Sequence, residues 1–213
     1  MINFIPIFPL GIVVYPGESL NLHIFEERYK QLVTQCFTDK KPFGIPAVLN
    51  EKVAETGTLV NIIEIVKTYE DGRMDIRTQG ADIFKVLEII KTVPDKLYSG
   101  AIVNYPPNNN ARNITMMLRV LADIRELHKL LDVTKNFNKP DEELVSYDVA
   151  HHAGLSLEEE YELLGLMYES QRLEYLKRHL KKIIPVITGT ENLKERVQLN
   201  GHFKELKGFD LGL

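Results

Sequence analysis

The 213-residue sequence has no tryptophan and only one cysteine, Cys36. A single cysteine cannot form an internal disulfide, and scarce cysteine is typical of proteins kept in a reducing compartment. Cys36 falls on the apolar face of a helix predicted after Glu26, where a thiol usually packs as a small hydrophobic group. We therefore expect a cytoplasmic protein in which Cys36 is buried and unreactive.

Long apolar runs and a targeting signal are also absent. No window of about 18 residues is both apolar and uncharged, so we expect no membrane span and no membrane association. The first residues, Met1 to Pro6, lack the basic and apolar regions of a signal peptide. The net charge of −4 disfavours nucleic acid as a partner, because nucleic-acid-binding surfaces are usually basic.

Motifs for catalysis and for cofactors are missing as well. The sequence contains neither the Gly-x-x-x-x-Gly-Lys-Ser/Thr loop that cradles phosphates nor a Gly-x-Ser-x-Gly elbow. His151 and His152 are adjacent, so on a helix their side chains diverge by about 100° and do not share a metal ion. We expect no catalytic residue, no cofactor and no metal site.

The first 107 residues have the pattern of a β-rich unit. Pro16-Gly17 is a turn signal, and Leu20, Leu22 and Ile24 then alternate with polar residues as in a half-buried strand. After Glu26 the apolar spacing becomes helical. Proline at 6, 9 and 16 removes backbone donors, which places this opening segment partly at a sheet edge.

Further strands follow at short intervals. Phe43 to Leu49 is a short apolar run, and residues 58–66 are apolar enough to predict burial on both faces. Asp71-Gly72 indicates a hairpin, Gly80 is expected to end the return strand, and residues 83–90 and 97–105 complete the set. Several short strands separated by turns predict a closed or nearly closed barrel over residues 1–107.

The second half of the chain is predicted to be helical. Pro106 to Ala111 is a composition break, and Asn113 can cap a helix that runs to about residue 131. Asp141 is expected to cap a shorter helix that ends at Gly154. Ser156 and Glu159 have capping-box spacing, and one long helix is expected from Leu157 to about Ile184, ended by Pro185. This helical subdomain spans 112–187, and the tail, 188–213, is expected to be partly mobile.

The opening run PIFPLGIVVYPGESLNLHIFEERYKQLV resembles the N-terminal substrate-binding domain of the Lon protease family. The match comprises an apolar-Pro-Leu pair, a Pro-Gly turn and a Leu-x-Ile-Phe-Glu-x-Arg-Tyr corner. Matched positions here are Pro9, Leu10, Pro16, Gly17, Leu22, Ile24, Phe25, Glu26, Arg28 and Tyr29. Later glycines, including Gly57 and Gly80, follow in the family order. Where the family often has Arg-Phe after that last glycine, this chain has Ala81 to Phe84, which leaves the arginine contact without a match.

The resemblance implies an α+β fold, with an N-terminal PUA-like β-barrel carrying one helix and a C-terminal helical bundle with one long helix. It also implies a bacterial, free-standing form of the domain, without the ATPase and peptidase domains of full Lon proteases. The family motif is expected to be mainly structural, with Glu26, Arg28 and Tyr29 clamping the strand-to-helix corner. Its members are Pro9, Leu10, Pro16, Gly17, Phe25, Glu26, Arg28, Tyr29, Gly57 and Gly80.

For function, the resemblance predicts a non-enzymatic module that binds unfolded or degradation-prone polypeptides or serves as a protease adaptor. The contact surface is expected to be an exposed apolar patch on the barrel or a groove between barrel and helices. RNA binding is the alternative, because other PUA-like barrels bind RNA. A ligand pocket like the thalidomide-binding module that accompanies some Lon-like domains is disfavoured, because that cage is built from tryptophans. Neither the client nor the oligomeric state is indicated.

Overall fold

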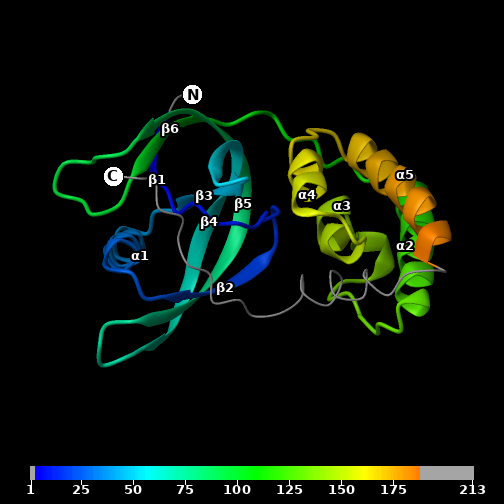
Figure 1. Ribbon diagram of the computed structural model, residues 1–213, viewed down its shortest axis with the longest axis horizontal. Coiled ribbons are helices and arrows are strands. Elements are labelled where there is room, and N and C mark those ends of the chain that lie inside the picture. The colour runs from blue at the N-terminus through cyan, green and yellow to red at the C-terminus, as the bar shows by residue number, and fades with distance from the viewer. Residues whose placement is uncertain (1–2, 188–213) are drawn as a thin grey trace. The chain divides into compact units, whose positions relative to one another are not determined.

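Figure 1 shows the computed structural model of the protein, which describes residues 3–187. The tail for which mobility is predicted, 188–213, lies outside the described residues. The chain divides between Pro106 and Pro107 into two compact units, here called the β unit and the helical unit. One unit is dominated by antiparallel strands and the other by helices, so the predicted α+β class is confirmed.

The β unit is built on a six-stranded antiparallel sheet in the order β1-β6-β5-β4-β3, with β2 paired to the first half of β5. Its elements are β1 (Asn3–Pro6), β2 (Ser19–Ile24), α1 (Glu27–Asp39), β3 (Phe43–Leu49), β4 (Lys52–Thr68), β5 (Met74–Ile90) and β6 (Gly100–Asn104). Side chains of α1, including Leu32 and Cys36, pack with the sheet in one apolar core. The predicted burial of Cys36 is confirmed.

The two ends of this strand order, β1 and β3, are linked through the segment that follows β1. Ile7 and Leu10 form isolated parallel bridges with Gly44 and Ala47, and the Phe8 N–H donates to the Gly44 carbonyl at 2.8 Å. Within residues 3–106 these bridges do not extend into a continuous ladder, so the sheet is not a closed barrel.

The prediction that Gly80 ends a strand is wrong, because β5 runs through it without a break. The backbone of the Pro16-Gly17 turn lies against Gly80. The Gly17 N–H donates to the Gly80 carbonyl at 2.9 Å, and the Gly80 N–H donates to the Glu18 carbonyl at 2.8 Å. A Cβ at residue 80 would lie 2.1 Å from the Tyr15 carbonyl oxygen. Glycine is needed here for close backbone approach, not for a turn.

The outer half of β4 is also more exposed than its apolar sequence predicts. Ile62 pairs with Thr78 and Glu64 with Arg77, so Ile63 is an extra residue with no partner on β5. Val66 is extra in the same way between Ile65 and Lys67. These two bulged residues are 50% and 59% exposed. The expectation that the whole run is buried on both faces is therefore wrong.

The helical unit contains α2 (Ile114–Leu130), α3 (Ser146–Val149), α4 (Leu157–Leu164) and α5 (Glu169–Ile187), with short 3-10 turns at Asp141–Glu143 and Ala150–His152. The Asn113 cap is confirmed, since its side chain accepts from the Met116 N–H at 3.0 Å. The capping box at Ser156 is also confirmed. Asp141 does not cap a helix that continues to Gly154; it forms a two-pronged ion pair with Arg125. Asp148 instead accepts from the Val145 N–H.

The single long helix predicted from Leu157 is wrong, because α4 and α5 are separate. Between them the chain extends, and Tyr168 forms a parallel bridge with Asn109. The Asn109 N–H donates to the Met167 carbonyl at 2.7 Å, and the Glu169 N–H donates to the Asn109 carbonyl at 2.9 Å. A distant segment thus takes the backbone groups that a continuous helix would use. At the other end α5 continues through Pro185 to Ile187, so the prediction that Pro185 ends the helix is wrong. Proline removes one helical hydrogen bond, but its fixed φ near −65° is compatible with a further helical turn.

None of the helices in residues 3–187 is both long enough and apolar enough to cross a lipid bilayer.

Candidate functional site

The strand-to-helix corner holds most of the residues that the family motif singles out. Arg28 donates from Nε to Glu26 Oε2 at 3.0 Å, and its guanidinium carbon lies 4.8 Å from the centre of the Tyr29 ring. Tyr29 is buried and stacks on Phe8 with ring centres 3.9 Å apart. Phe25 lies near His23, with ring centres 6.2 Å apart.

The other motif residues are distributed through the β unit. Pro9 and Leu10 are buried beside β3, while Pro16 and Gly17 form the turn that meets Gly80. A Cβ at Gly57 would lie 2.6 Å from both the Ile45 carbonyl and the Phe84 ring. These contacts fit a structural role for the motif, and that role stays a prediction.

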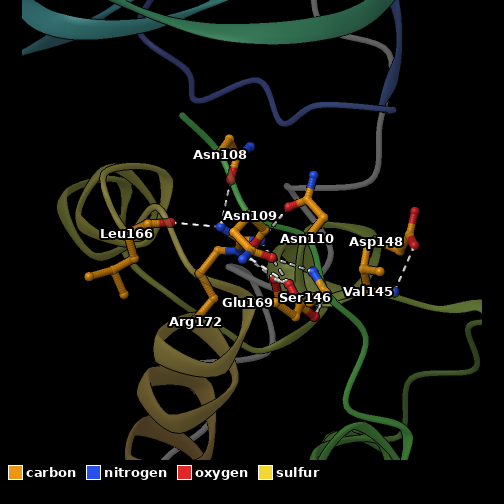
Figure 2. Close-up of polar contacts among 10 residues, drawn as sticks. Asn108, Asn109, Asn110, Val145, Ser146, Asp148, Leu166, Glu169 and Arg172 are labelled. Atoms are coloured by element: carbon orange, nitrogen blue, oxygen red, sulfur yellow. Dashed lines mark hydrogen bonds and ion pairs between the residues drawn. The ribbon is translucent and has the colours of Figure 1, made fainter. Parts of the chain in front are cut away.

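The most connected polar group in the helical unit is Arg172, which sequence reasoning did not select. Its side chain is 0% exposed and pairs with Glu169 at 2.9 Å between Nη2 and Oε2. Figure 2 shows the surrounding partners, which come from three separate segments of the chain. Nε donates to Ser146 Oγ at 2.8 Å, and Nη1 donates to the Leu166 carbonyl at 2.7 Å.

Three consecutive asparagines complete this Arg172 network. Asn108 Oδ1 accepts from Nη1 at 3.0 Å, and both the Asn109 carbonyl and Asn110 Oδ1 accept from Nη2. The five N–H groups of a guanidinium therefore all have acceptors, which is the condition for burying this charge. The network ties the segment before α2 to the first turns of α3 and α5.

Ser146 and Glu169 have the types and the spacing of a nucleophile and a base, but their surroundings exclude that chemistry. Ser146 Oγ donates to Glu169 Oε2 at 2.6 Å and accepts from Arg172, and the Ser146 N–H donates to Glu169 Oε1 at 2.8 Å. Both side chains are buried. A hydroxyl that is already bonded and shielded from solvent cannot reach a substrate, so the pair is structural.

The sequence held one signal for this network. Ser170-Gln171-Arg172 interrupts the apolar stripe of the predicted long helix, and one of those polar residues had to face inward. Pattern alone cannot supply its partners, because Asn108 to Asn110 and Ser146 lie far away in the chain. The buried arginine and the break between α4 and α5 were missed for the same reason.

A shallow pocket of about 460 Å3 opens beside the network in the helical unit. Asn109 and Glu169 belong both to the network and to the pocket wall. The rim carries Tyr168, 55% exposed, Ile114, 49% exposed, and the exposed Arg112. Within the described residues Arg112 has no ion-pair partner. The pocket thus combines a rigid polar wall with accessible apolar and cationic side chains.

Comparison with known proteins assigns this fold. A family model described as the ATP-dependent protease La (LON) substrate-binding domain matches residues 5–182. The chain belongs to the Lon substrate-binding domain family. The family resemblance read from the sequence is therefore confirmed.

Two solved structures show the same fold as this Lon-family chain. The Lon N-terminal domain protein of Xanthomonas campestris is 26% identical, with a TM-score of 0.64 over 83% of this chain and 98% of that one. The N-terminal domain of the Mycobacterium avium complex Lon protease is 12% identical, with a TM-score of 0.59 over 84% and 98%, and it shows the fold alone. No curated protein matches the sequence.

Four histidines of this Lon-family domain lie in the helical unit, and two of them, His128 and His152, pack with ring centres 5.8 Å apart. His151 Nδ1 is 2.8 Å from Glu160 Oε1, and His128 Nε2 is 3.0 Å from the His152 carbonyl. Burial lowers the pKa of His152 to about 4, with neighbouring His128 and Lys135 acting in the same direction. Among the described residues, no three histidine, cysteine or acidic side chains converge as metal ligands.

Proposed function

We propose that the protein binds polypeptide segments without chemical turnover, and that the pocket beside the Arg172 network is one contact surface. The observation that carries this proposal is the pocket rim, where Tyr168, Ile114 and Arg112 stay accessible on a wall that is fixed from behind. Tyrosine and arginine supply much of the binding energy at protein interfaces. Membership in a substrate-binding family supports a polypeptide as the ligand.

The hydrogen bonds behind the pocket wall favour binding. Asn109 and Glu169 accept hydrogen bonds from Arg172, part-buried for Asn109 and buried for Glu169, so little ordering of the protein is needed when a segment docks. The rim offers an aromatic ring, an aliphatic chain and a positive charge, which suits a segment with apolar and acidic side chains. Unfolded polypeptides expose such side chains together, whereas folded proteins bury most of the apolar ones.

Two finer points belong to the same proposal. The β unit is an open form of a PUA-like barrel, a view supported by the two parallel bridges that join its edge segments.

The protein also acts as an adaptor that delivers a bound segment to a protease, as its family suggests. Adding it to a purified Lon-family protease should then speed degradation of an unfolded client, and an unchanged rate would contradict the adaptor role.

Client binding can be measured through the tryptophan fluorescence of the client, because this chain has none. The client is a tryptophan-containing protein, presented either reduced and carboxymethylated, so that it stays unfolded, or in its native form. We expect saturable binding of the unfolded form and much weaker binding of the native one. Equal affinity for both would contradict the proposal, and binding to structured RNA that weakens with salt would favour the RNA alternative.

The role of the pocket is tested with a matched pair of variants. Tyr168→Ala removes the exposed ring from the rim and should weaken binding about tenfold, as expected for an interface aromatic. Leu130→Ala removes an exposed apolar side chain at the other end of α2 and should leave affinity unchanged. Equal client affinity of the two variants would contradict a contact surface at the pocket.

A further inference from the structure

The second half of β4 is a sheet edge within the described residues. Pairing between β3 and β4 ends at Val60, and from Asn61 to Thr68 the only strand that pairs with β4 in residues 3–187 is β5. Figure 1 shows the β4–β5 hairpin extending beyond the rest of the β unit at the lower left. A strand with one neighbour directs alternate N–H and C=O groups away from it, where another extended chain can pair.

Two apolar side chains on this edge are exposed, which is unusual for an edge strand. Ile63 and Val66, the two bulged residues, are exposed, whereas Ile62 and Ile65 pack partly against the core. The inward pair holds the segment in place and the bulges present the other pair to solvent. A bulge leaves its extra residue unpaired and re-aims its side chain.

Protection against aggregation does not explain this arrangement. Bulges discourage edge-to-edge pairing, and the exposed Lys67 on this edge does so as well, but neither device requires apolar side chains at the exposed bulged positions. Here the exposed bulged positions hold isoleucine and valine, both β-branched and apolar. Another strand with a single ladder partner, β2, differs: its residues Asn21 and His23 are polar, and His23 bonds Asp75 at 2.6 Å.

We propose that the edge of β4 from Asn61 to Thr68 binds an extended segment of another polypeptide, which adds to the sheet as an extra strand and covers Ile63 and Val66. This inference rests on the proposed function and supplies a second contact surface for it, with the client class defined as unfolded segments of alternating apolar residues. Backbone pairing explains how such a surface accepts many sequences, because the hydrogen bonds involve no side chain of the client.

The bulges also select the occupant. A second copy of this chain would bring the same rigid, twice-bulged edge, and two such edges do not align as a regular ladder. An unfolded segment can bend at each bulge and keep its hydrogen bonds. The charged neighbours, Glu64 paired with Arg77 and Lys67 over the Tyr69 ring, are already engaged and leave the apolar pair as the contact.

The side-chain test uses the double variant Ile63→Thr/Val66→Thr, which keeps the β-branched shape and removes the apolar character. The matched control is Leu97→Thr, at a residue that is 58% exposed but lies outside the strands. The ligand is a short peptide of alternating valine and serine with one tryptophan as the fluorescent reporter. We expect the double variant to bind about tenfold more weakly and the control to bind as the unaltered protein does.

The backbone test uses the same peptide with N-methyl groups on either the valines or the serines. Strand addition directs alternate N–H groups to the protein, so one methylated series should lose binding and the other should keep it. Equal binding of both series would overturn strand addition. A sedimentation experiment that shows a dimer of the unaltered protein and a monomer of the double variant would overturn the choice of occupant.

The outcomes separate the two proposals. If the unaltered protein binds no unfolded polypeptide, the proposed function fails. If the unaltered protein binds the carboxymethylated client, and the double variant binds both client and peptide as tightly as the unaltered protein does, only the edge proposal fails.

Discussion

The guanidinium carbon of Arg172 lies 4.1 Å from the centre of the Tyr147 ring, so the charge is covered on its face by an aromatic group and satisfied at its rim by hydrogen bonds. Burial raises the pKa of Tyr147 to about 12, with the nearby Arg172 acting in the opposite direction. The tyrosine therefore stays neutral over the physiological range. Arg172 also bonds Asn109 and Glu169, which line the pocket, so the pair supports the pocket wall.

Arg172→Met is expected to destabilise the helical unit strongly. It leaves the buried Glu169 carboxylate without its cation, and breaking a buried ion pair costs about 3–5 kcal/mol. Urea unfolding followed by far-ultraviolet circular dichroism measures the loss. Arg125→Met, which breaks the exposed pair with Asp141, should have little effect. Adding Glu169→Gln to the Arg172 variant should restore part of the stability; no recovery would mean that charge imbalance is not the cause.

Gly80→Ala is expected to destabilise the β unit by about 1–3 kcal/mol, the usual range for overpacking. The new methyl group would press on the backbone carbonyl of Tyr15, and a backbone atom cannot swing aside as a flexible side chain does. Gly11→Ala is the control, because its new methyl group would have no atom within 4 Å and its φ is not left-handed. Similar unfolding midpoints for the two variants would contradict the close-approach explanation.

Stability should fall as the pH drops below the ordinary histidine range. Burial lowers the folded-state pKa of His128, His152 and His179, so the unfolded chain binds more protons once the pH falls below about 6.5. For His152 the window extends from 6.5 to about 4, which corresponds to a loss on the order of 3 kcal/mol when fully crossed. Thermal unfolding across this window should show a falling midpoint, and His152→Leu should flatten the dependence. An unfolding midpoint that stays constant across this pH range would contradict a role of the buried histidines in stability.

Cys36 should react slowly with thiol reagents while the protein is folded. Its side chain is buried, and burial, aided by Asp39, raises the thiol pKa to about 11. Little reactive thiolate is therefore present at mildly alkaline pH. Absorbance with an aromatic disulfide reagent should rise slowly in buffer and rapidly in urea. Fast reaction of the folded protein would show that α1 opens readily from the sheet.

Local signals in the sequence predicted local structure well. The Asn113 and Ser156 caps, the hairpin at Gly72 and the Pro16-Gly17 turn all depend on residues close together in the chain. The errors share a different origin. The uninterrupted β5 at Gly80 depends on Tyr15, and the break between α4 and α5 depends on Asn109, so each is set by a partner that periodicity cannot reveal.

The same reason limits prediction of the site. The first part of the family motif was visible because its residues lie close together in the sequence, yet the structure buries several of them, including Pro9, Leu10 and Tyr29. Arg172 was visible only as an interruption in an apolar stripe, and Ile63 and Val66 looked like ordinary core residues. Their exposure follows from the register with β5, which no pattern within β4 encodes.

The pairing of β1 with β6 has a consequence for synthesis of the chain. Ile5 pairs with Ala101, so the first strand of the β unit to leave the ribosome has its partner among the last residues of that unit to emerge. Contacts between residues so distant in sequence form slowly, because a long loop must close before they are made. During translation β1 therefore stays without its partner strand until β6 has been synthesised, and the β1–β6 ladder can form only after that.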